Sequence, residues 1–229
     1  MPLDWARIEA ICFDVDGTLS DTDNHMVASI MKPMGALRGL IPHKSARYLA
    51  RGLVMAFESP GNFIYHLADR LGIDHAVSSL ADWLSRHALQ RKPATFWLIP
   101  DVQDMLDQLE GRFPLSIVSA RGRIGTETFL NQFQLHSRFR SIATSQTCRH
   151  TKPFPDPVIW AARQMGVAPA NCLMVGDTVV DIKAGRAAGA QTAGVLCGFG
   201  TRRELERAGA DVILNTTADL IREMDQANL

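Results

Sequence analysis

Short apolar runs alternate along most of the chain with segments whose apolar residues have helical spacing. The apolar runs predict strands at residues 8–13, 115–119, 140–143, 172–175, 192–196 and 211–214. Between these runs, apolar residues recur three and four positions apart, as at Val102, Met105 and Leu109, and this spacing predicts amphipathic helices. Strands that alternate with single helices predict an α/β fold of the doubly wound, Rossmann-like type, with a parallel sheet covered on both faces.

Residues 20–92 break this alternation. The segment has no strand-like run, its apolar residues recur at helical spacing, and glycine and proline divide it into roughly four helices. We therefore expect two domains. An α/β core is formed by residues 1–19 and 93–229, and an all-helical domain, residues 20–92, is inserted after the first strand.

Composition excludes several classes of protein. The 229 residues are 46% hydrophobic, and 24 basic residues match 24 acidic ones, so no excess of positive charge indicates a nucleic-acid partner. The longest uncharged run, residues 187–201, is too short and too polar to span a membrane. The N-terminus lacks the pattern of a secretory signal, and the four cysteines form no CxxC pair. We therefore expect a cytoplasmic protein without disulfides, either a monomer or a homodimer.

Two pairs of aspartates follow predicted strands. Asp14 and Asp16 lie in DVDGTL after the first strand, and Asp177 and Asp181 lie in GDTVVD after the fourth. Because ligands bind at the carboxyl ends of such strands, we expect both pairs to face one site. Converging carboxylates favour Mg²⁺ where phosphate is the companion ligand, and a cation or a raised pKa would let the first pair lie close together. A solvated turn and helix capping are the alternative interpretations.

Two further residues suit a phosphate site. Ser119 ends the second predicted strand, where its hydroxyl could hold phosphate oxygens. Lys152 precedes a predicted helix and could neutralise both the phosphate and the acids. Each has an ordinary alternative, because a serine there can be a turn residue and a lysine before proline can be a solvated surface residue.

Four segments follow one another along the chain: DVDGTL, Ser119, Lys152-Pro153 and GDTVVD. In this order they resemble the motifs of the haloacid dehalogenase (HAD) superfamily, in its phosphatase-like subgroup with a helical cap inserted after the first motif. The resemblance covers nearly the whole chain and extends to KPFPDP at 152–157 and DIKAGRAAGA at 181–190. It implies that Asp14 is the nucleophile and forms an aspartyl-phosphate, which water then hydrolyses. It also implies that Asp16 protonates the leaving group and later deprotonates the water.

The resemblance further implies a Mg²⁺ site. Asp14, Asp177 and the backbone carbonyl of Asp16 are the implied ligands. Asp181 is implied either to hold the metal through water or to position Lys152. Ser119 and Lys152 are implied to act on the phosphate.

The implied function is a Mg²⁺-dependent phosphomonoester hydrolase of small phosphorylated metabolites, similar to phosphoglycolate phosphatase. A sugar-phosphate phosphomutase, of the β-phosphoglucomutase type, and a phosphonate hydrolase share this core and remain alternatives. The phosphonate hydrolase would need a Schiff-base lysine in the cap, where Lys32 and Lys44 are the candidates. A noncatalytic phospho-signalling domain also has acids at strand ends, but it needs no helical insertion of this size.

One position departs from the family pattern. The residue after Ser119 is often asparagine in these phosphatases, and here it is Ala120. Arg121 or Arg123 could compensate by reaching an anionic substrate, although we expect both to lie in a solvated loop. A basic stretch around Arg51 in the cap could bind a second anionic group, with exposed helix charges as the alternative.

Overall fold

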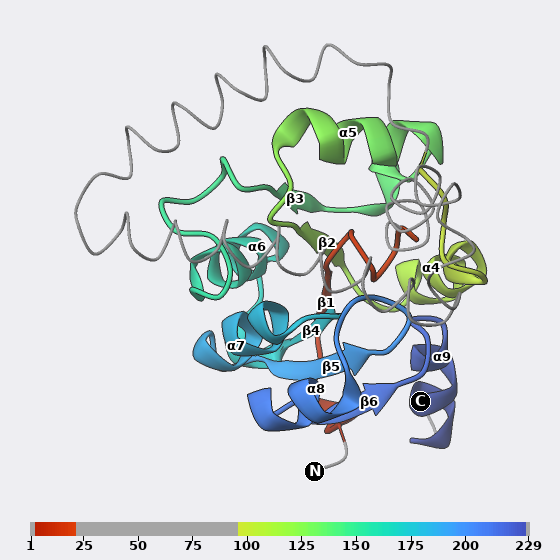
Figure 1. Cartoon of the computed structure of the whole chain (residues 1–229), viewed down its shortest axis with the longest axis vertical. Helices are drawn as coiled ribbons and strands as arrows, with labels where there is room; N and C mark the ends of the chain where they lie inside the picture. Colours follow the sequence, from red (N-terminus) through yellow and green to blue (C-terminus); the bar gives the residue numbers. More distant parts are fainter. Residues whose placement is uncertain (1–2, 22–95, 228–229) are drawn as a thin grey trace, which may run out of the picture. The chain divides into compact units, whose positions relative to one another are not determined.

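A six-stranded parallel sheet forms the centre of the computed structural model, which describes residues 3–21 and 96–227. Its strand order is β3-β2-β1-β4-β5-β6 (Figure 1). The strands are β1 (Ala10–Phe13), β2 (Leu115–Val118), β3 (Ser141–Ala143), β4 (Cys172–Gly176), β5 (Gln191–Val195) and β6 (Val212–Leu214). The six predicted strands and their parallel arrangement are therefore confirmed, with ends that differ by at most two residues.

Helices follow the strands and cover the sheet on both faces. The α-helices are α4 (Val102–Glu110), α5 (Arg123–Gln132), α6 (Asp156–Met165), α7 (Val179–Ala187), α8 (Arg202–Ala208) and α9 (Asp219–Gln226). Short 3-10 helices are η1 (Trp5–Arg7), η3 (His136–Arg138) and η4 (Pro169–Asn171). Figure 1 shows α4 and α9 on the right of the sheet and α6 and α7 on the left. Among the described residues, no helix combines the length and apolar character needed to cross a membrane.

The central strand β1 shows why its sequence is continuously apolar. Successive side chains of a strand point to opposite faces of the sheet. Ile11 and Phe13 belong to the core cluster that includes residues of α4 and α9, whereas Ala10 and Cys12 belong to the cluster that includes residues of α6 and α7. All four are fully buried, so neither face of the strand admits a polar side chain until β1 ends.

The chain segments on either side of residues 22–95 are held together. Ser20 forms an antiparallel bridge with Leu98, and the backbone N–H of Asp21 donates to the carbonyl of Trp97 at 2.8 Å. This pairing is what an insertion between two core elements requires. The helical character and the boundaries predicted for the inserted domain fall almost entirely outside the described residues and stay predictions.

Removing the Phe13 side chain should destabilise the sheet strongly. Phe13 is fully buried at the end of β1, so Phe13→Ala leaves a cavity and should lower the free energy of unfolding by about 3–5 kcal/mol. Ile124 on α5 is 78% exposed, so Ile124→Ala is the matched control and should change it by less than about 0.5 kcal/mol. Urea unfolding measures both, and equal stabilities of the two variants would contradict this account of the core.

Candidate active site

The carboxyl ends of β1 and β4 bring three aspartates together. Asp14 follows β1, Asp177 follows β4, and Asp181 lies in the first turn of α7. One carboxylate oxygen of each lies within 4.8 Å of the other two, and all three residues are buried. Because β1 and β4 are neighbours in the sheet, aspartates far apart in the sequence meet at one edge, as the sequence pattern predicted.

Lys152 lies among these carboxylates. Its Nζ donates hydrogen bonds to Oδ1 of Asp14 at 2.7 Å and to Oδ1 of Asp181 at 2.5 Å, and the residue is 3% exposed. The interpretation of Lys152 as a solvated surface residue is therefore wrong. Burial disfavours the charged ammonium, but the nearby charges of Asp14 and Asp181 outweigh this effect and raise the pKa of Lys152 above its ordinary value.

The charge of the cluster fits a divalent cation. Asp14, Asp177 and Asp181 contribute three negative charges when ionised and Lys152 contributes one positive charge, so these four residues have a formal charge of minus two. Oxygen ligands of this charge at the end of a sheet suit a hard cation such as Mg²⁺. The carboxylate oxygens of the three aspartates are therefore suitable ligands for the Mg²⁺ expected from the sequence.

The buried site changes the pKa of Asp14. Its pKa is raised from about 3.8 to about 7: burial is the largest cause, the charges of Asp181 and Asp16 add to the rise, and Lys152 opposes it. The raised pKa expected within the first acidic pair thus falls on the residue to which the HAD resemblance assigns the nucleophile. A raised pKa does not by itself identify the general acid in this site.

Asp181 both caps a helix and orients Lys152. Its Oδ2 accepts hydrogen bonds from the backbone N–H of Thr178 at 3.0 Å and from the Thr178 hydroxyl at 2.6 Å. Thr178 is the N-cap of α7, so the capping position belongs to this residue and not to Asp177. Because Oδ2 is held by the cap, Oδ1 of Asp181 is directed to Lys152. Capping and site formation, treated as alternatives from the sequence, are here two functions of one side chain.

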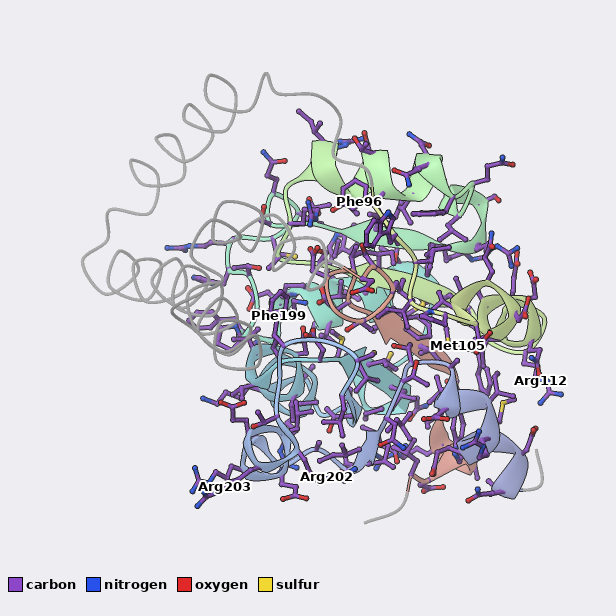
Figure 2. All side chains as sticks on the ribbon, turned by 45° about the vertical axis from the view of Figure 1, so that its right-hand side comes forward. Phe96, Met105, Arg112, Phe199, Arg202 and Arg203 are labelled. Carbon is purple, nitrogen blue, oxygen red and sulfur yellow. The ribbon has the colours of Figure 1, made fainter. Side chains whose placement is uncertain are left out.

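The loop formed by residues 198–200, after β5, fixes the carboxylate of Asp177. The backbone N–H of Phe199 donates to Oδ2 of Asp177 at 2.7 Å, and Figure 2 labels Phe199 on this loop. A Cβ added to Gly198 would collide with the same carboxylate. Sequence reasoning missed this loop, although the pattern Gly-Phe-Gly directly after a predicted strand is a signal that backbone approaches another group closely there.

The turn after β1 also packs against Asp177. The hydroxyl of Thr18 donates to Oδ1 of Asp177 at 3.4 Å. Gly17 has a φ of 74°, and a Cβ there would collide with the Asp177 carboxylate. Thr217, which is fully buried, donates its hydroxyl to the carbonyl of Thr18 at 2.5 Å and holds the turn in place. Asp177 is therefore oriented by three segments that are distant in the sequence.

Ser119 lies at the same edge of the sheet, directly after β2. It is buried, its backbone N–H donates to the carbonyl of Ala143 at 2.9 Å, and its hydroxyl oxygen accepts from the backbone N–H of Arg121 at 3.1 Å. Strand β2 pairs with β1, which ends at the nucleophile candidate Asp14. The turn role and the site position of Ser119 are thus compatible.

Arg121 does not lie in a solvated loop, contrary to the sequence-based expectation. Its Nε donates to Oδ2 of Asp16 at 2.9 Å, its Nη2 pairs with Oδ1 of the same carboxylate, and its guanidinium lies over the Phe96 ring with 5.1 Å to the centroid. Only 26% of its side chain is exposed. Arg123 is solvated as expected, with 74% of its side chain exposed, but it is the first residue of α5 and not part of a loop, and it pairs with Glu127 on the same helix.

Comparison with known proteins agrees with this arrangement. Residues 11–195 match the family model described as haloacid dehalogenase-like hydrolase. The chain belongs to this family. The HAD resemblance read from the four motifs and the assignment of the chain as a hydrolase are thereby confirmed.

Relatives and solved structures of similar length accompany the family match. Pyrophosphatase PpaX from Bacillus velezensis is 27% identical over 217 residues, which cover 94% of this chain and 95% of that protein. Phosphoglycolate phosphatase from Aquifex aeolicus is 27% identical over 221 residues, which cover 95% of this chain and 97% of that protein. The crystal structure of a predicted phosphatase from Clostridium acetobutylicum aligns with a TM-score of 0.69 at 20% identity over 97% of this chain and 99% of its own. At 20% identity, the comparison with the Clostridium acetobutylicum structure supports the fold alone.

The raised pKa of Asp14 predicts how the stability of this HAD hydrolase depends on pH. Between the ordinary pKa of about 3.8 and the folded value of about 7, the folded state binds more protons than the unfolded state. Without metal, stability should therefore fall as pH rises through this window. Asp14→Asn cannot ionise at this position, so in EDTA its stability relative to the wild type should be higher at pH ~8 than at pH ~5 by at least about 1 kcal/mol. Urea unfolding at the two pH values measures this, and an unchanged difference would contradict it.

Proposed function

We propose that this hydrolase is a Mg²⁺-dependent phosphomonoester phosphatase that acts on a small phosphorylated metabolite through an aspartyl-phosphate on Asp14. One observation carries the proposal: Asp14, Asp177 and Asp181 converge around the buried ammonium of Lys152 at the ends of two adjacent strands. The names of two relatives, a pyrophosphatase and a phosphoglycolate phosphatase, support the same reaction class.

In the proposed reaction, a carboxylate oxygen of Asp14 attacks the phosphorus and the bond to the leaving oxygen breaks. Lys152 fixes the orientation of Asp14 through its 2.7 Å hydrogen bond and balances negative charge beside the incoming phosphate. The hydroxyl of Ser119 donates a hydrogen bond to a phosphate oxygen. Asp16 supplies a proton to the leaving oxygen, then removes one from the water that hydrolyses the aspartyl-phosphate.

Asp14, Asp177 and the backbone carbonyl of Asp16 would hold the Mg²⁺, with Asp181 acting through water. When bound, the ion reduces the repulsion between the Asp14 carboxylate and the phosphate dianion. The two hydrogen bonds that clamp Asp177, one on each carboxylate oxygen, support its assignment as a ligand, because a metal ligand must be held in one orientation before the ion binds.

The described core residues supply groups for phosphate and metal only. We therefore assign the choice of ester to the inserted residues, predicted from the sequence as a helical domain over 20–92. The sugar-phosphate phosphomutase remains the second reading of the same core, and it differs in returning the phosphoryl group to the substrate rather than to water.

Phosphate release from a panel of esters tests the proposed reaction. The panel contains p-nitrophenyl phosphate, phosphoglycolate, sugar phosphates and inorganic pyrophosphate, each with Mg²⁺ or EDTA. Turnover should require Mg²⁺ and should fall at least about 1,000-fold in Asp14→Asn, because that variant lacks the nucleophile. Asp225→Asn makes the same chemical change at an exposed aspartate on α9 and should keep full activity.

The same panel separates the alternatives. Isomerisation of a sugar phosphate without net phosphate release would favour the phosphomutase. A folded wild type that releases no phosphate from any member of the panel would refute the phosphatase assignment.

The clamp on Asp177 predicts a variant with weakened metal binding. A Cβ in Gly198→Ala would collide with the Asp177 carboxylate, so one of them must move. Displacing the support of a ligand should weaken Mg²⁺ binding about 10-fold to 100-fold. The concentration of Mg²⁺ that raises the thermal unfolding temperature measures this without turnover. Gly111→Ala, at a glycine with open space around its Cβ position, is the matched control, and equal Mg²⁺ dependence in the two variants would refute the role of the clamp.

A further inference from the structure

Asp16 is bound by an arginine that lies outside the aspartate, serine and lysine motifs of the family resemblance. We propose that Arg121 is a positioning residue for the acid–base carboxylate of Asp16, which it holds at both oxygens in the orientation that proton transfer needs. The inference rests on the proposed function, because Asp16 has an acid–base role only in that reaction.

The first observation is the form of the contact. Arg121 uses two nitrogens on two oxygens: Nε donates to Oδ2 at 2.9 Å and Nη2 pairs with Oδ1. Two parallel hydrogen bonds fix a carboxylate against rotation as well as translation, which a single contact with a lysine ammonium cannot do. The pair is partly shielded from water, with 26% of the Arg121 side chain and 23% of the Asp16 side chain exposed.

The second observation is that Arg121 is itself held rigidly. Its guanidinium lies over the ring of Phe96, which is labelled in Figure 2. That ring packs edge-on against Phe129 of α5. Its backbone N–H donates to the hydroxyl of Ser119, and its carbonyl accepts from the backbone N–H of Ser145 at 3.1 Å. Other groups hold both the backbone and the guanidinium of Arg121. It can therefore fix the position of the Asp16 carboxylate instead of moving with it.

The third observation is that a glycine lies beside the aliphatic part of the Arg121 side chain. Gly125 on α5 faces it, and a Cβ there would lie 2.9 Å from Cδ of Arg121. Gly125 is the third residue of α5, and glycine is a poorer helix former than alanine. Helix stability alone therefore gives no reason for glycine at this position, whereas the arginine stem does.

Holding Asp16 matters in both halves of the proposed reaction. In the first, the Asp14–phosphorus bond forms, the phosphorus–oxygen bond to the leaving group breaks, and the proton of Asp16 goes to the leaving oxygen. In the second, the water oxygen bonds to phosphorus, the bond to Asp14 breaks, and Asp16 takes the proton of the water. Protonated Asp16 retains one bare oxygen, so Arg121 can keep one hydrogen bond while the other oxygen transfers the proton.

The leaving group provides the test. An alkoxide needs a proton as it leaves, whereas p-nitrophenolate is stable without one. We compare kcat/KM, which reports the steps up to formation of the aspartyl-phosphate, for p-nitrophenyl phosphate and for alkyl esters. Phosphoglycolate, whose leaving group carries a carboxylate, and glycerol phosphate, whose leaving group is uncharged, are both measured as alkyl esters.

Arg121→Met should lower kcat/KM for the alkyl esters by about 10-fold to 100-fold and for p-nitrophenyl phosphate by less than about threefold. Arg121→Lys should restore only part of the loss, because lysine keeps the charge without the two-point contact. Arg123→Met removes an arginine two positions away that is exposed and pairs within α5, and it should leave both values unchanged. Urea midpoints of the variants confirm that each is folded.

Two results would overturn the inference. Equal losses of kcat/KM on p-nitrophenyl phosphate and on the alkyl esters would show that Arg121 acts on the transferred phosphate or on the fold. A loss of kcat/KM on phosphoglycolate without a loss on glycerol phosphate, whose leaving group is uncharged, would show that Arg121 binds a second anionic group of the substrate. If the wild type releases no phosphate from any member of the panel, the proposed function fails, whereas normal wild-type cleavage with an unchanged leaving-group preference in Arg121→Met defeats the role of Arg121 alone.

Discussion

The buried ion pairs of Lys152 are the interaction on which the rest of the site depends. An ammonium that is 3% exposed is tolerable only because Asp14 and Asp181 both accept its hydrogen bonds. Removing either carboxylate would leave charge uncompensated in the interior. The same pairing leaves the three-aspartate cluster with two negative charges in excess, a charge that suits a divalent cation.

Each charged residue of the site is held by a different part of the fold. The register of β1 beside β4 sets Asp14, the capping contacts of α7 set Asp181, and the loop of residues 198–200 sets Asp177. Asp16 is set by Arg121, which is stacked in turn on Phe96. The reacting groups therefore lie on a rigid sheet edge, and this preorganisation is what electrostatic catalysis requires.

Much of the core and part of the site could be predicted from local sequence. The strand at β1 was predictable because a strand buried on both faces must be continuously apolar. Asp14 and Asp177 were predictable as site residues because ligands bind where parallel strands end. Arg121 was misjudged because a loop arginine near glycine looks solvated when its partner, Asp16, lies 105 residues earlier. The loop after β5 was missed for the same reason, since its partner Asp177 belongs to another strand.

The sequence by itself determined the alternation of strands and helices, the places where acids end the strands, and the family that these motifs indicate. Those features follow from periodicity and from short-range spacing, which one chain displays directly. Only the tertiary structure decided that Lys152 is buried between two carboxylates, that Asp181 serves cap and lysine together, and that Arg121 holds Asp16. Such pairings depend on which chain segments become neighbours in the folded sheet, and strand order is set by packing of the whole domain rather than by any local pattern.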